Sequence, residues 1–323
     1  MSTIVIGGAG FIGLHVCREL QRQGHDPVIL DTFVHKGSEA AASKLVQSAN
    51  VLAVDATDPA ALGPHIQAGD TVFNLATVCV REALRNPIRA TADISALGMV
   101  PAAVCARHPE VRYVYVSSSE IYGSALGGKQ HEGTLPQPCT VYGAAKLAGE
   151  FYARSMHLQK GLDISIIRPF NAYGPGCHIG GIAGEVIPRW IMQALQGEPL
   201  TLYGGAQSRD FTYVTDLAAG IVAAGLDRRL MNTGPINLAS GIEKTLRSVA
   251  TSITLRYAAA LQQQPPRPAD LTRQIGGASR ARLLLGWEPT VTWEAGLDRT
   301  CTDMAVRRGS EGDPEMPSRA WEA

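Results

Sequence analysis

Short apolar runs alternate with segments of helical periodicity along most of the chain. The first run, TIVIGG at residues 3–8, breaks on glycine, and residues 11–23 then carry apolar side chains at helical spacing. Comparable runs follow in PVILD, VLAVD, TVFNLA, YVYVSSS and DISIIRPFN, with helical segments between them. Strands that alternate with helices predict a parallel sheet covered on both faces. The expected fold class is therefore α/β, with a doubly wound parallel sheet.

The pattern changes after Asn171. A glycine-rich loop comes first, followed by a helical segment at 185–197, a hairpin-like stretch at 199–214 and a second helical segment at 215–226. The run PINLAS at 235–240 has the character of a strand that returns to the main sheet. The chain is therefore expected to divide into a sheet domain and a smaller lobe.

Two separated segments build each of these predicted units. We expect the main sheet domain at 1–171 and about 212–240, and a smaller discontinuous α/β substrate lobe at about 172–211 and 241–307. Residues 308–323 are polar and contain two prolines, so they predict a loose tail.

Charge and composition narrow the classes of function. The 29 basic residues balance 29 acidic residues, so no net field favours binding to nucleic acid or to an anionic membrane surface. The six cysteines are scattered without the spacing of metal ligands, and we expect buried thiols in a reducing compartment. No apolar run approaches the ~18 residues of a membrane span. These features predict a cytoplasmic protein without a bound metal.

The segment GGAGFIG contains three glycines directly after the first strand and at the start of a helix. Gly7 permits a tight turn, Gly10 lets a pyrophosphate approach the backbone, and Gly13 lets the helix pack closely on the strand. Asp31 ends the next strand about 20 residues later, where a carboxylate accepts a hydrogen bond from a ribose 2′-hydroxyl. Asp55 ends a further strand, within expected reach of the adenine. Because an acidic group repels a 2′-phosphate, this pattern predicts a Rossmann domain that binds NAD rather than NADP.

Tyr142 and Lys146 lie four residues apart at the start of a predicted helix, so both side chains emerge on one face. Upstream, an apolar strand ends in Ser117, Ser118 and Ser119, at the edge where such sheets bind ligands. A lysine ammonium and an oxidised nicotinamide both favour the phenolate of a tyrosine, which then acts as a general base. This set of side chains predicts hydride transfer between a secondary alcohol and NAD.

The chain resembles the extended short-chain dehydrogenase/reductases, and within them the NAD-dependent nucleotide-sugar epimerase/dehydratase family. The resemblance extends from Ile4 to about Thr302 and rests on ordered blocks of sequence. These blocks are GGAGFIG, NLA at 74–76, SSSEIYG, YGAAK, RPFNAYGPG, RDFTYVTD and RARLLLGWEP. They are specific for the family and do not specify the sugar.

The resemblance implies a role for individual residues. Ser118, Tyr142 and Lys146 match the catalytic positions of the family. Arg209 and Arg267 match positions that bind the diphosphate, which two guanidiniums neutralise bidentately. The expected substrate-binding residues are Ser119, Asn171, Arg209 and Arg267. The expected cofactor-binding residues are Gly7, Gly10, Phe11, Ile12, Gly13, Asp31, Asp55, Ala56, Leu75, Ala76 and Lys146.

Several positions depart from the family pattern. Ile6 stands where Thr is usual, and Ser95 stands where an Asn usually braces the active-site strand. We interpret these two differences as structural. The block YGPG is followed by Cys177 and His178, where related enzymes often carry an Arg. No clamp for a C6 carboxylate is evident there, which argues against a sugar acid as the substrate.

The resemblance implies that Tyr142 deprotonates the C4 hydroxyl of the sugar while the C4 hydride passes to NAD⁺. The 4-keto sugar then regains the hydride on its other face, or loses the C6 hydroxyl after removal of the C5 proton, or loses a C6 carboxylate as carbon dioxide. Glu120 stands where dehydratases and decarboxylases of the family carry a glutamate, whereas Ser119 stands where some dehydratases carry an aspartic acid. We expect a nucleotide-sugar 4-epimerase first. The alternative is a 4,6-dehydratase or decarboxylase in which Glu120 is a catalytic residue for C5 chemistry.

Two other classes of protein fit less of the sequence. An extended reductase of steroid or flavonoid ketones has no need for Arg209, Arg267 or the RPFNAYGPG loop. A catalytically silent NAD-binding sensor would be expected to lose the tyrosine or the lysine, and both are present. The resemblance also implies a nucleotide-diphosphate sugar as the ligand and a homodimer formed through the helix of Tyr142 and the helix before the serine strand.

Overall fold

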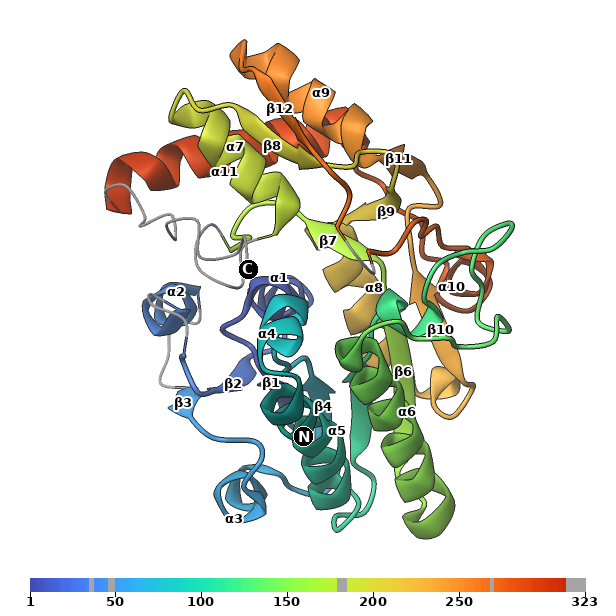
Figure 1. Cartoon of the computed structure of the whole chain (residues 1–323). Coiled ribbons are helices and arrows are strands. Elements are labelled where there is room, and N and C mark those ends of the chain that lie inside the picture. Colours follow the sequence, from blue (N-terminus) through green and yellow to red (C-terminus); the bar gives the residue numbers. More distant parts are fainter. Residues whose placement is uncertain (35–37, 46–49, 179–184, 268–269, 312–323) are drawn as a thin grey trace.

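The computed structural model describes residues 1–34, 38–45, 50–178, 185–267 and 270–311. Its main sheet contains β1 (Thr3–Ile6), β2 (Pro27–Asp31), β3 (Val51–Ala53), β4 (Thr71–Asn74), β5 (Arg112–Val116), β6 (Asp163–Pro169) and β10 (Pro235–Leu238). These seven strands are parallel and lie in the order β10-β6-β5-β4-β1-β2-β3 (Figure 1). The predicted doubly wound parallel sheet is confirmed, and the run PINLAS does return a strand to it.

Helices cover both faces of this sheet (Figure 1). They are α1 (Phe11–Arg22), α2 (Ser38–Leu45), α3 (Pro59–Leu62), α4 (Val80–Arg85), α5 (Pro87–Cys105), α6 (Val141–Lys160), α8 (Val214–Leu226) and α10 (Ser279–Leu285), with the 3-10 turns η1 (Gly63–His65), η2 (Ser119–Tyr122) and η3 (Arg228–Leu230). Helices α1 and α8 pack together on one face, and α5 and α6 pack side by side on the other.

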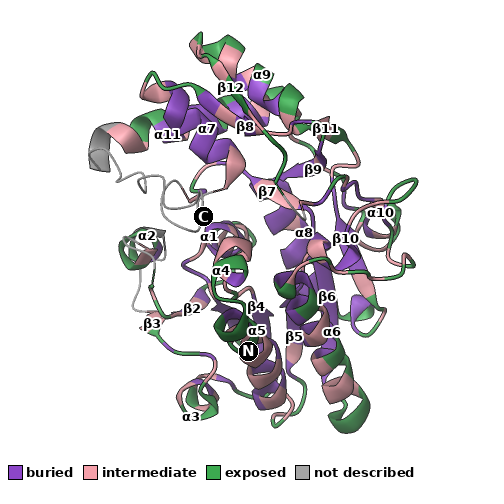
Figure 2. Ribbon diagram, in the orientation of Figure 1, coloured by how far each residue is buried: buried purple, intermediate pink, exposed green. Residues whose placement is uncertain are grey.

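Alternate side chains of the strands supply two apolar cores. Val5, Phe73 and Val114 belong to the core beneath α1 and α8, whereas Ile4 and Val72 belong to the core beneath α5 and α6. Successive side chains of a strand point to opposite faces. Because both faces are covered, the strands read as continuous apolar runs rather than alternating ones. Figure 2 shows the central strands of this sheet as buried.

Within the described residues, the lobe consists of two small sheets and three helices. One sheet has the order β11 (Glu243–Thr245), β9 (Ser208–Tyr213) and β7 (Asn171–Tyr173), and the other pairs β12 (Leu261–Gln264) with β8 (Leu200–Tyr203). The helices are α7 (Val186–Leu195), α9 (Leu246–Tyr257) and α11 (Trp293–Glu311). The hairpin expected at 199–214 is wrong, because β8 pairs with β12 while β9 pairs with β7 and β11. Gly204 and Gly205 both take positive φ between the two strands and turn the chain from one sheet into the other.

The place of one segment differs from the expected division into units. The predicted lobe segment 241–307 includes α10, yet α10 packs on α8 and β10. Ala281 and Trp287 are part of the core beneath α1 and α8. Helix α10 and the residues that follow it to Trp287 therefore belong to the main unit, not to the lobe. The expected tail at 308–323 begins inside α11, which continues to Glu311, and the residues after that lie outside the described part of the chain.

Helix α5 is the only helix in the described part of the chain with both the length and the mean hydropathy of a membrane span. Length and composition alone do not separate a membrane span from a helix that covers a sheet, and α5 packs against α6 on the sheet. Some apolar side chains of this helix pair stay exposed, including Ile88 at 88% and Phe151 at 57%. The predicted cytoplasmic location stays a prediction.

The six cysteines are free thiols, but they are not all buried as expected. Cys139 is exposed and Cys79 is half-buried, whereas the other four are buried. Within the described residues, no group of three or more His, Cys, Asp or Glu side chains is placed to hold a metal ion.

A buried polar network joins four elements near the carboxyl edge of the sheet. Arg168 on β6 donates two hydrogen bonds to the carboxylate of Glu150 on α6, at 2.9 and 2.7 Å. The same guanidinium donates to the hydroxyl of Tyr122 at 2.7 Å, and Tyr122 donates to the side chain of Asn237 on β10 at 2.8 Å. The side chains of Arg168 and Glu150 are only 6% and 7% exposed. The network ties the end of the SSSEIYG segment to α6 and to the sheet.

Glu150→Ala is expected to lower the free energy of unfolding by about 3–5 kcal/mol, because it leaves the charge of Arg168 buried without its partner. Denaturant unfolding followed by circular dichroism measures this change. The control is Arg22→Ala, which removes a pair with Glu19 in which the arginine is 71% exposed. That substitution should cost much less, because a solvent-exposed ion pair contributes little, and equal effects of the two substitutions would contradict the role of the buried pair.

Candidate active site

The turn between β1 and α1 has a shape that glycine alone accommodates. Gly7 has a φ of 76°, and a Cβ on it would lie 2.7 Å from the backbone nitrogen of Ala76. A Cβ on Gly13 would lie 2.3 Å from the carbonyl oxygen of Gly7, so the helix packs against the turn as predicted. Gly10 is the N-cap of α1 and has no side chain over the helix N-terminus. The N–H groups of this terminus therefore fit the pyrophosphate of a dinucleotide.

The two strand-end carboxylates predicted to bind the cofactor also stabilise turns of the protein itself. Asp31 accepts hydrogen bonds from the backbone N–H groups of Ala9 at 3.0 Å and Phe33 at 2.9 Å, which ties the glycine turn to the end of β2. Asp55 accepts hydrogen bonds from the backbone N–H and the hydroxyl of Thr57, at 2.9 and 2.7 Å. Each carboxylate has further lone pairs. Contacts of Asp31 with the ribose and of Asp55 with the adenine stay predictions.

The apolar residues of the predicted cofactor set come from three segments at the carboxyl edge of the sheet. Phe11 and Ile12 open α1, Ala56 follows β3, and Leu75 and Ala76 follow β4. Phe11 and Ala56 are buried, and the other three are half-buried. Their contact with NAD stays a prediction, and the segments have the placement that it requires.

The structure brings the predicted serine and tyrosine together. Tyr142 and Lys146 are buried in the first turns of α6, which is capped by the hydroxyl of Thr140. The hydroxyl of Tyr142 forms hydrogen bonds with the side chains of Ser118 and Thr77. A substrate hydroxyl placed at Tyr142 would therefore also be within reach of Ser118.

The pKa of Tyr142 is raised in the protein alone. Burial raises this pKa to about 12; the hydrogen bond with Ser118 lowers it, and the negative charge of Glu120 raises it. A phenol in this state needs a nearby positive charge to lose its proton near neutral pH.

Lys146 contacts the sheet rather than the phenol of Tyr142 within the described structure. Its ammonium donates a hydrogen bond to the carbonyl oxygen of Val116 at 2.7 Å and lies 4.9 Å from the centre of the Tyr115 ring. Burial lowers the pKa of Lys146 to about 7, and the charge of Glu150 opposes this shift. The predicted contact of Lys146 with the nicotinamide ribose stays a prediction.

Glu120 belongs to the same site. It is half-buried in η2, and its backbone N–H donates to the hydroxyl of Ser118 at 3.1 Å. The hydroxyl of Thr140 donates to its carboxylate at 3.5 Å. Burial raises the pKa of Glu120, while the charge of Arg209 and the hydrogen bond of Thr140 lower it. A carboxyl group with a raised pKa beside Tyr142 is suited to hold or deliver a proton.

A cavity of about 170 Å³ separates elements of the lobe from α4. Three of the predicted substrate residues, Asn171, Arg209 and Arg267, line it. The fourth, Ser119, is not part of this lining and is only 3% exposed. The predicted diphosphate ligands are thus gathered in one place.

Neighbouring groups orient these ligands. Arg209 forms an ion pair with Asp270 at 2.8 Å. The guanidinium of Arg267 lies 4.1 Å from the centre of the Tyr203 ring. The amide of Asn171 donates to the carbonyl oxygen of Asp210 at 3.0 Å and to the side chain of Gln274 at 2.8 Å.

Sequence reasoning missed two further arginines of the cavity lining, Arg81 on α4 and Arg189 on α7. Neither belongs to a family block, so no motif points to them. Arg189 is the fourth residue of its helix and Arg81 is the second of its own, after the NLA block. Only the tertiary structure places them beside Arg209 and Arg267.

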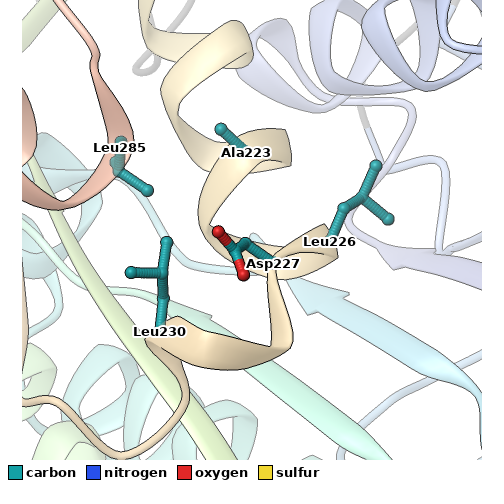
Figure 3. A pocket seen from close by; sticks show the side chains of 5 residues that line it. All are labelled: Ala223, Leu226, Asp227, Leu230 and Leu285. Atoms are coloured by element: carbon teal, nitrogen blue, oxygen red, sulfur yellow. The ribbon is translucent and has the colours of Figure 1, made fainter.

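A second hollow, of about 420 Å³, lies where α8 passes into η3 and faces α10 (Figure 3). Its lining is formed by Ala223, Leu226, Asp227, Leu230 and Leu285. None of these belongs to the predicted site. Its mainly aliphatic lining lacks the groups that the predicted chemistry needs, so its larger volume does not mark the active site.

Residues 3–239 match the NAD dependent epimerase/dehydratase family. The UDP-glucuronic acid decarboxylase 1 of Danio rerio is 31% identical over 311 residues, which span 92% of this chain and 71% of that protein. The UDP-N-acetyl-alpha-D-glucosaminuronate decarboxylase of Bacillus cytotoxicus is 30% identical over 326 residues, which span 92% of this chain and 95% of that protein.

Solved structures show the same architecture. The UDP-glucose 4-epimerase of Thermotoga maritima with UDP-glucose superposes with a TM-score of 0.86 at 25% identity, covering 96% of this chain and 100% of that one. The dTDP-glucose 4,6-dehydratase DesIV of Streptomyces venezuelae, with NAD and TYD bound, gives a TM-score of 0.89 at 25% identity, covering 96% and 98%.

The chain therefore belongs to the NAD-dependent epimerase/dehydratase family, as the sequence blocks predicted. It is an NAD-dependent enzyme that acts on nucleotide sugars. The relatives include decarboxylases, 4-epimerases and a dehydratase. Family membership consequently does not decide among the three outcomes of the 4-keto sugar.

Tyr142→Phe is expected to lower turnover by at least about 10²-fold, because it removes the predicted general base. NAD binding should stay close to that of the wild type, as the phenol lies outside the glycine turn. Product formation followed by chromatography and a fluorescence titration with NAD measure the two effects. Tyr152→Phe, on the same helix, is the matched control and should keep its activity; substantial activity of Tyr142→Phe would contradict the assigned role.

Proposed function

We propose that the enzyme oxidises C4 of a nucleotide-linked sugar acid and then releases its C6 carboxylate as carbon dioxide. The observation that carries this proposal is the position of Glu120, a half-buried carboxyl group beside Tyr142 and Ser118. Simple 4-epimerisation has no task for an acid at C5. The relatives from Danio rerio and Bacillus cytotoxicus are both named as decarboxylases. Decarboxylation therefore replaces 4-epimerisation as the first candidate.

The first step uses the serine and tyrosine that the fold brings together. Tyr142 accepts the proton of the C4 hydroxyl, and Ser118 holds the same oxygen through a hydrogen bond. When bound, NAD supplies the hydride acceptor at C4 and, in its oxidised form, a positive charge that favours the phenolate. The sugar becomes a 4-ketone.

The second step follows from the position of the ketone. A C6 carboxylate is β to the C4 carbonyl, so the C5–C6 bond breaks, carbon dioxide leaves, and the electron pair enters the C4 enolate. Glu120 in its protonated form then gives a proton to C5. Tyr142 gives its proton back to the C4 oxygen as the hydride returns to C4, so the product is a nucleotide-linked pentose, with no net oxidation.

The site favours decarboxylation over dehydration for a chemical reason. Carbon dioxide leaves without a proton, so decarboxylation needs one proton donor, at C5. Dehydration needs a base at C5 and also an acid for the leaving C6 hydroxyl. Ser119 occupies the place of the dehydratase aspartic acid and is buried, which leaves Glu120 as the group beside Tyr142 for both tasks.

The second candidate is 4-epimerisation, and the segment after YGPG favours it. The carbonyl oxygen of Cys177 accepts two hydrogen bonds from Arg307, at 3.0 and 2.9 Å, and the thiol is buried. The ring of His178 packs edge-on against Phe11 at 6.5 Å. This segment provides no guanidinium for a C6 carboxylate, as expected for an enzyme of neutral sugars.

Product analysis in deuterated water separates these reactions. With NAD⁺ and UDP-glucuronate, decarboxylation gives carbon dioxide and a pentose with deuterium at C5. Glu120→Gln should slow this reaction by about 10²-fold or more, whereas Glu198→Gln, at an exposed carboxylate, should not. A C4 epimer without deuterium would refute the proposal in favour of the second candidate. A 4-keto-6-deoxy product from UDP-glucose or UDP-N-acetylglucosamine would refute it in favour of dehydration.

We further propose that two copies pair through α5 and α6. The exposed apolar side chains of these helices include Ile88, Phe151 and Leu158, at 88%, 57% and 74%. An exposed apolar helix pair is stabilised by contact with an identical pair, which gives a four-helix interface. The family resemblance implies the same arrangement.

Phe151→Glu should convert this dimer into a monomer, because it places a charge in the apolar contact. Light scattering is expected to give about twice 34.3 kDa for the wild type and about 34.3 kDa for the variant. Leu255→Glu, at an 80% exposed position on α9, is the control and should remain dimeric. A monomeric wild type would contradict the proposed pairing.

A further inference from the structure

The side-chain amide of Asn171 is held in one orientation. Its nitrogen lies 3.0 Å from the main-chain carbonyl oxygen of Asp210 and 2.8 Å from the side-chain oxygen of Gln274. A main-chain carbonyl oxygen can only accept a hydrogen bond, so the atom of Asn171 that faces Asp210 must be the nitrogen. The atom of Gln274 that faces the same nitrogen must then be an oxygen. Both N–H donors of Asn171 are therefore used inside the protein.

The oxygen of this amide is the group that is left for a ligand. Asp210 and Gln274 are both 0% exposed, and neither of them lines the cavity. Asn171 is half-buried and does line it. Within the described residues, no hydrogen bond occupies the Oδ1 atom of Asn171. Because the nitrogen is turned into the protein, Asn171 presents a hydrogen-bond acceptor to the cavity.

An acceptor at this place does not suit the diphosphate of a nucleotide sugar. The oxygens of an ionised phosphate are themselves acceptors and have no hydrogen to share with Oδ1. The guanidiniums that line the same cavity are the donors that a diphosphate needs. A sugar hydroxyl, in contrast, can donate to Oδ1. The polarity of Asn171 thus indicates contact with a hydroxyl group.

Asn171 lies at the end of the cavity that adjoins Glu120. It directly follows Phe170, whose ring stacks on that of Tyr122 in η2 with 6.3 Å between the ring centres. Glu120 belongs to the same turn, and the charge of Arg209, another residue of the cavity lining, acts on it. The part of the substrate beside Glu120 is the reacting sugar. The hydroxyl at Asn171 is therefore one of the sugar and not one of the nucleoside.

Gln274 leaves one of its own polar groups unpaired. Its Nε2 atom is buried and has no hydrogen-bond partner among the described residues. A buried donor without a partner is unfavourable, and an apolar side chain of similar size would avoid this cost. The contribution of Gln274 is therefore its oxygen, which holds the amide of Asn171.

We propose that Gln274 is a positioning residue that turns Oδ1 of Asn171 towards the substrate, where Asn171 accepts a hydrogen bond from a hydroxyl group of the sugar ring. The inference rests on the nucleotide-sugar part of the proposed function and not on decarboxylation. It changes the expected contact of Asn171 from a general substrate contact to a specific one with the sugar. Gln274 lies outside the sequence blocks of the family, so no motif points to it.

Equilibrium binding tests this assignment without turnover. Tyr142→Phe loaded with NAD⁺ is titrated calorimetrically with UDP, UDP-glucuronate and UDP-xylose. The two sugar nucleotides share the hydroxyls at C2, C3 and C4, and only UDP-glucuronate has a C6 carboxylate. Adding Asn171→Ala should weaken both sugar nucleotides by about threefold to tenfold, the loss expected for one neutral hydrogen bond. The affinity for UDP should stay close to that of the parent, which also shows that the variant is folded.

The role of Gln274 is measured by the ratio of the UDP-xylose affinity to the UDP affinity. Gln274→Met should lower this ratio by about twofold or more, because it removes one of the two hydrogen bonds that fix the amide. Gln274→Glu retains an acceptor for Asn171 and should keep the ratio closer to that of the parent. Gln67→Met, at an exposed position before β4, is the matched control and should leave the ratio unchanged.

A residue that only stabilises the fold would give the opposite order of the two Gln274 variants. Glutamate would then be worse than methionine, because it places a charge at a buried position. That order would overturn the positioning role.

Further results would overturn the contact itself. An equal loss for UDP in Asn171→Ala would make Asn171 a ligand of the diphosphate or the nucleoside. A loss confined to UDP-glucuronate would assign the contact to the C6 carboxylate. Unchanged affinities in Asn171→Ala, or sugar nucleotides that bind the parent no more tightly than UDP, would also count against it. The expected losses without release of carbon dioxide by the wild type would refute decarboxylation and leave this inference standing.

Discussion

The catalytic geometry depends on the buried ion pair between Arg168 and Glu150. A buried pair of this kind stabilises a protein only while both charges and their hydrogen bonds are present. Here it holds α6 against β6, and the same guanidinium holds Tyr122 at the end of the serine segment. Ser118 and Tyr142 come from separate segments. They meet because this network fixes the helix and the strand end relative to one another.

Burial shifts the pKa values of the titratable groups of the site in opposite directions, but every shift favours the neutral form. It raises the pKa of Tyr142 and Glu120 and lowers that of Lys146. All three groups are thereby shifted towards their neutral forms in the protein alone. The guanidiniums gather instead in the cavity between α4 and the lobe. Proton transfer and anion binding thus occupy adjoining regions of one cleft, and a ligand with a charged end and a reactive hydroxyl must span both.

Much of the site was predictable because its residues lie at the ends of parallel strands. Successive apolar runs end at the same sheet edge, so Gly7, Asp31 and Ser118 were expected to face one ligand. The helical spacing of Tyr142 and Lys146 placed both on one face, and both are buried in the first turns of α6. These inferences needed only local periodicity and the rules of parallel sheets. The hairpin at 199–214 failed because short strands that are close in the sequence need not pair with each other.

The sequence by itself determined the fold class, the family and the cofactor, and it predicted Ser118, Tyr142 and Lys146 as catalytic residues, since each is encoded in a local pattern or an ordered block. The tertiary structure decided which distant charges meet. Arg81 and Arg209 are far apart in the sequence, and no periodicity relates α4 to β9, yet both line one cavity. The placement of Glu120 beside Tyr142 and Arg209 likewise depends on the packing of η2 against α6. Charge recognition is a property of three-dimensional proximity, because electrostatic energy depends on distance and burial rather than on order along the chain.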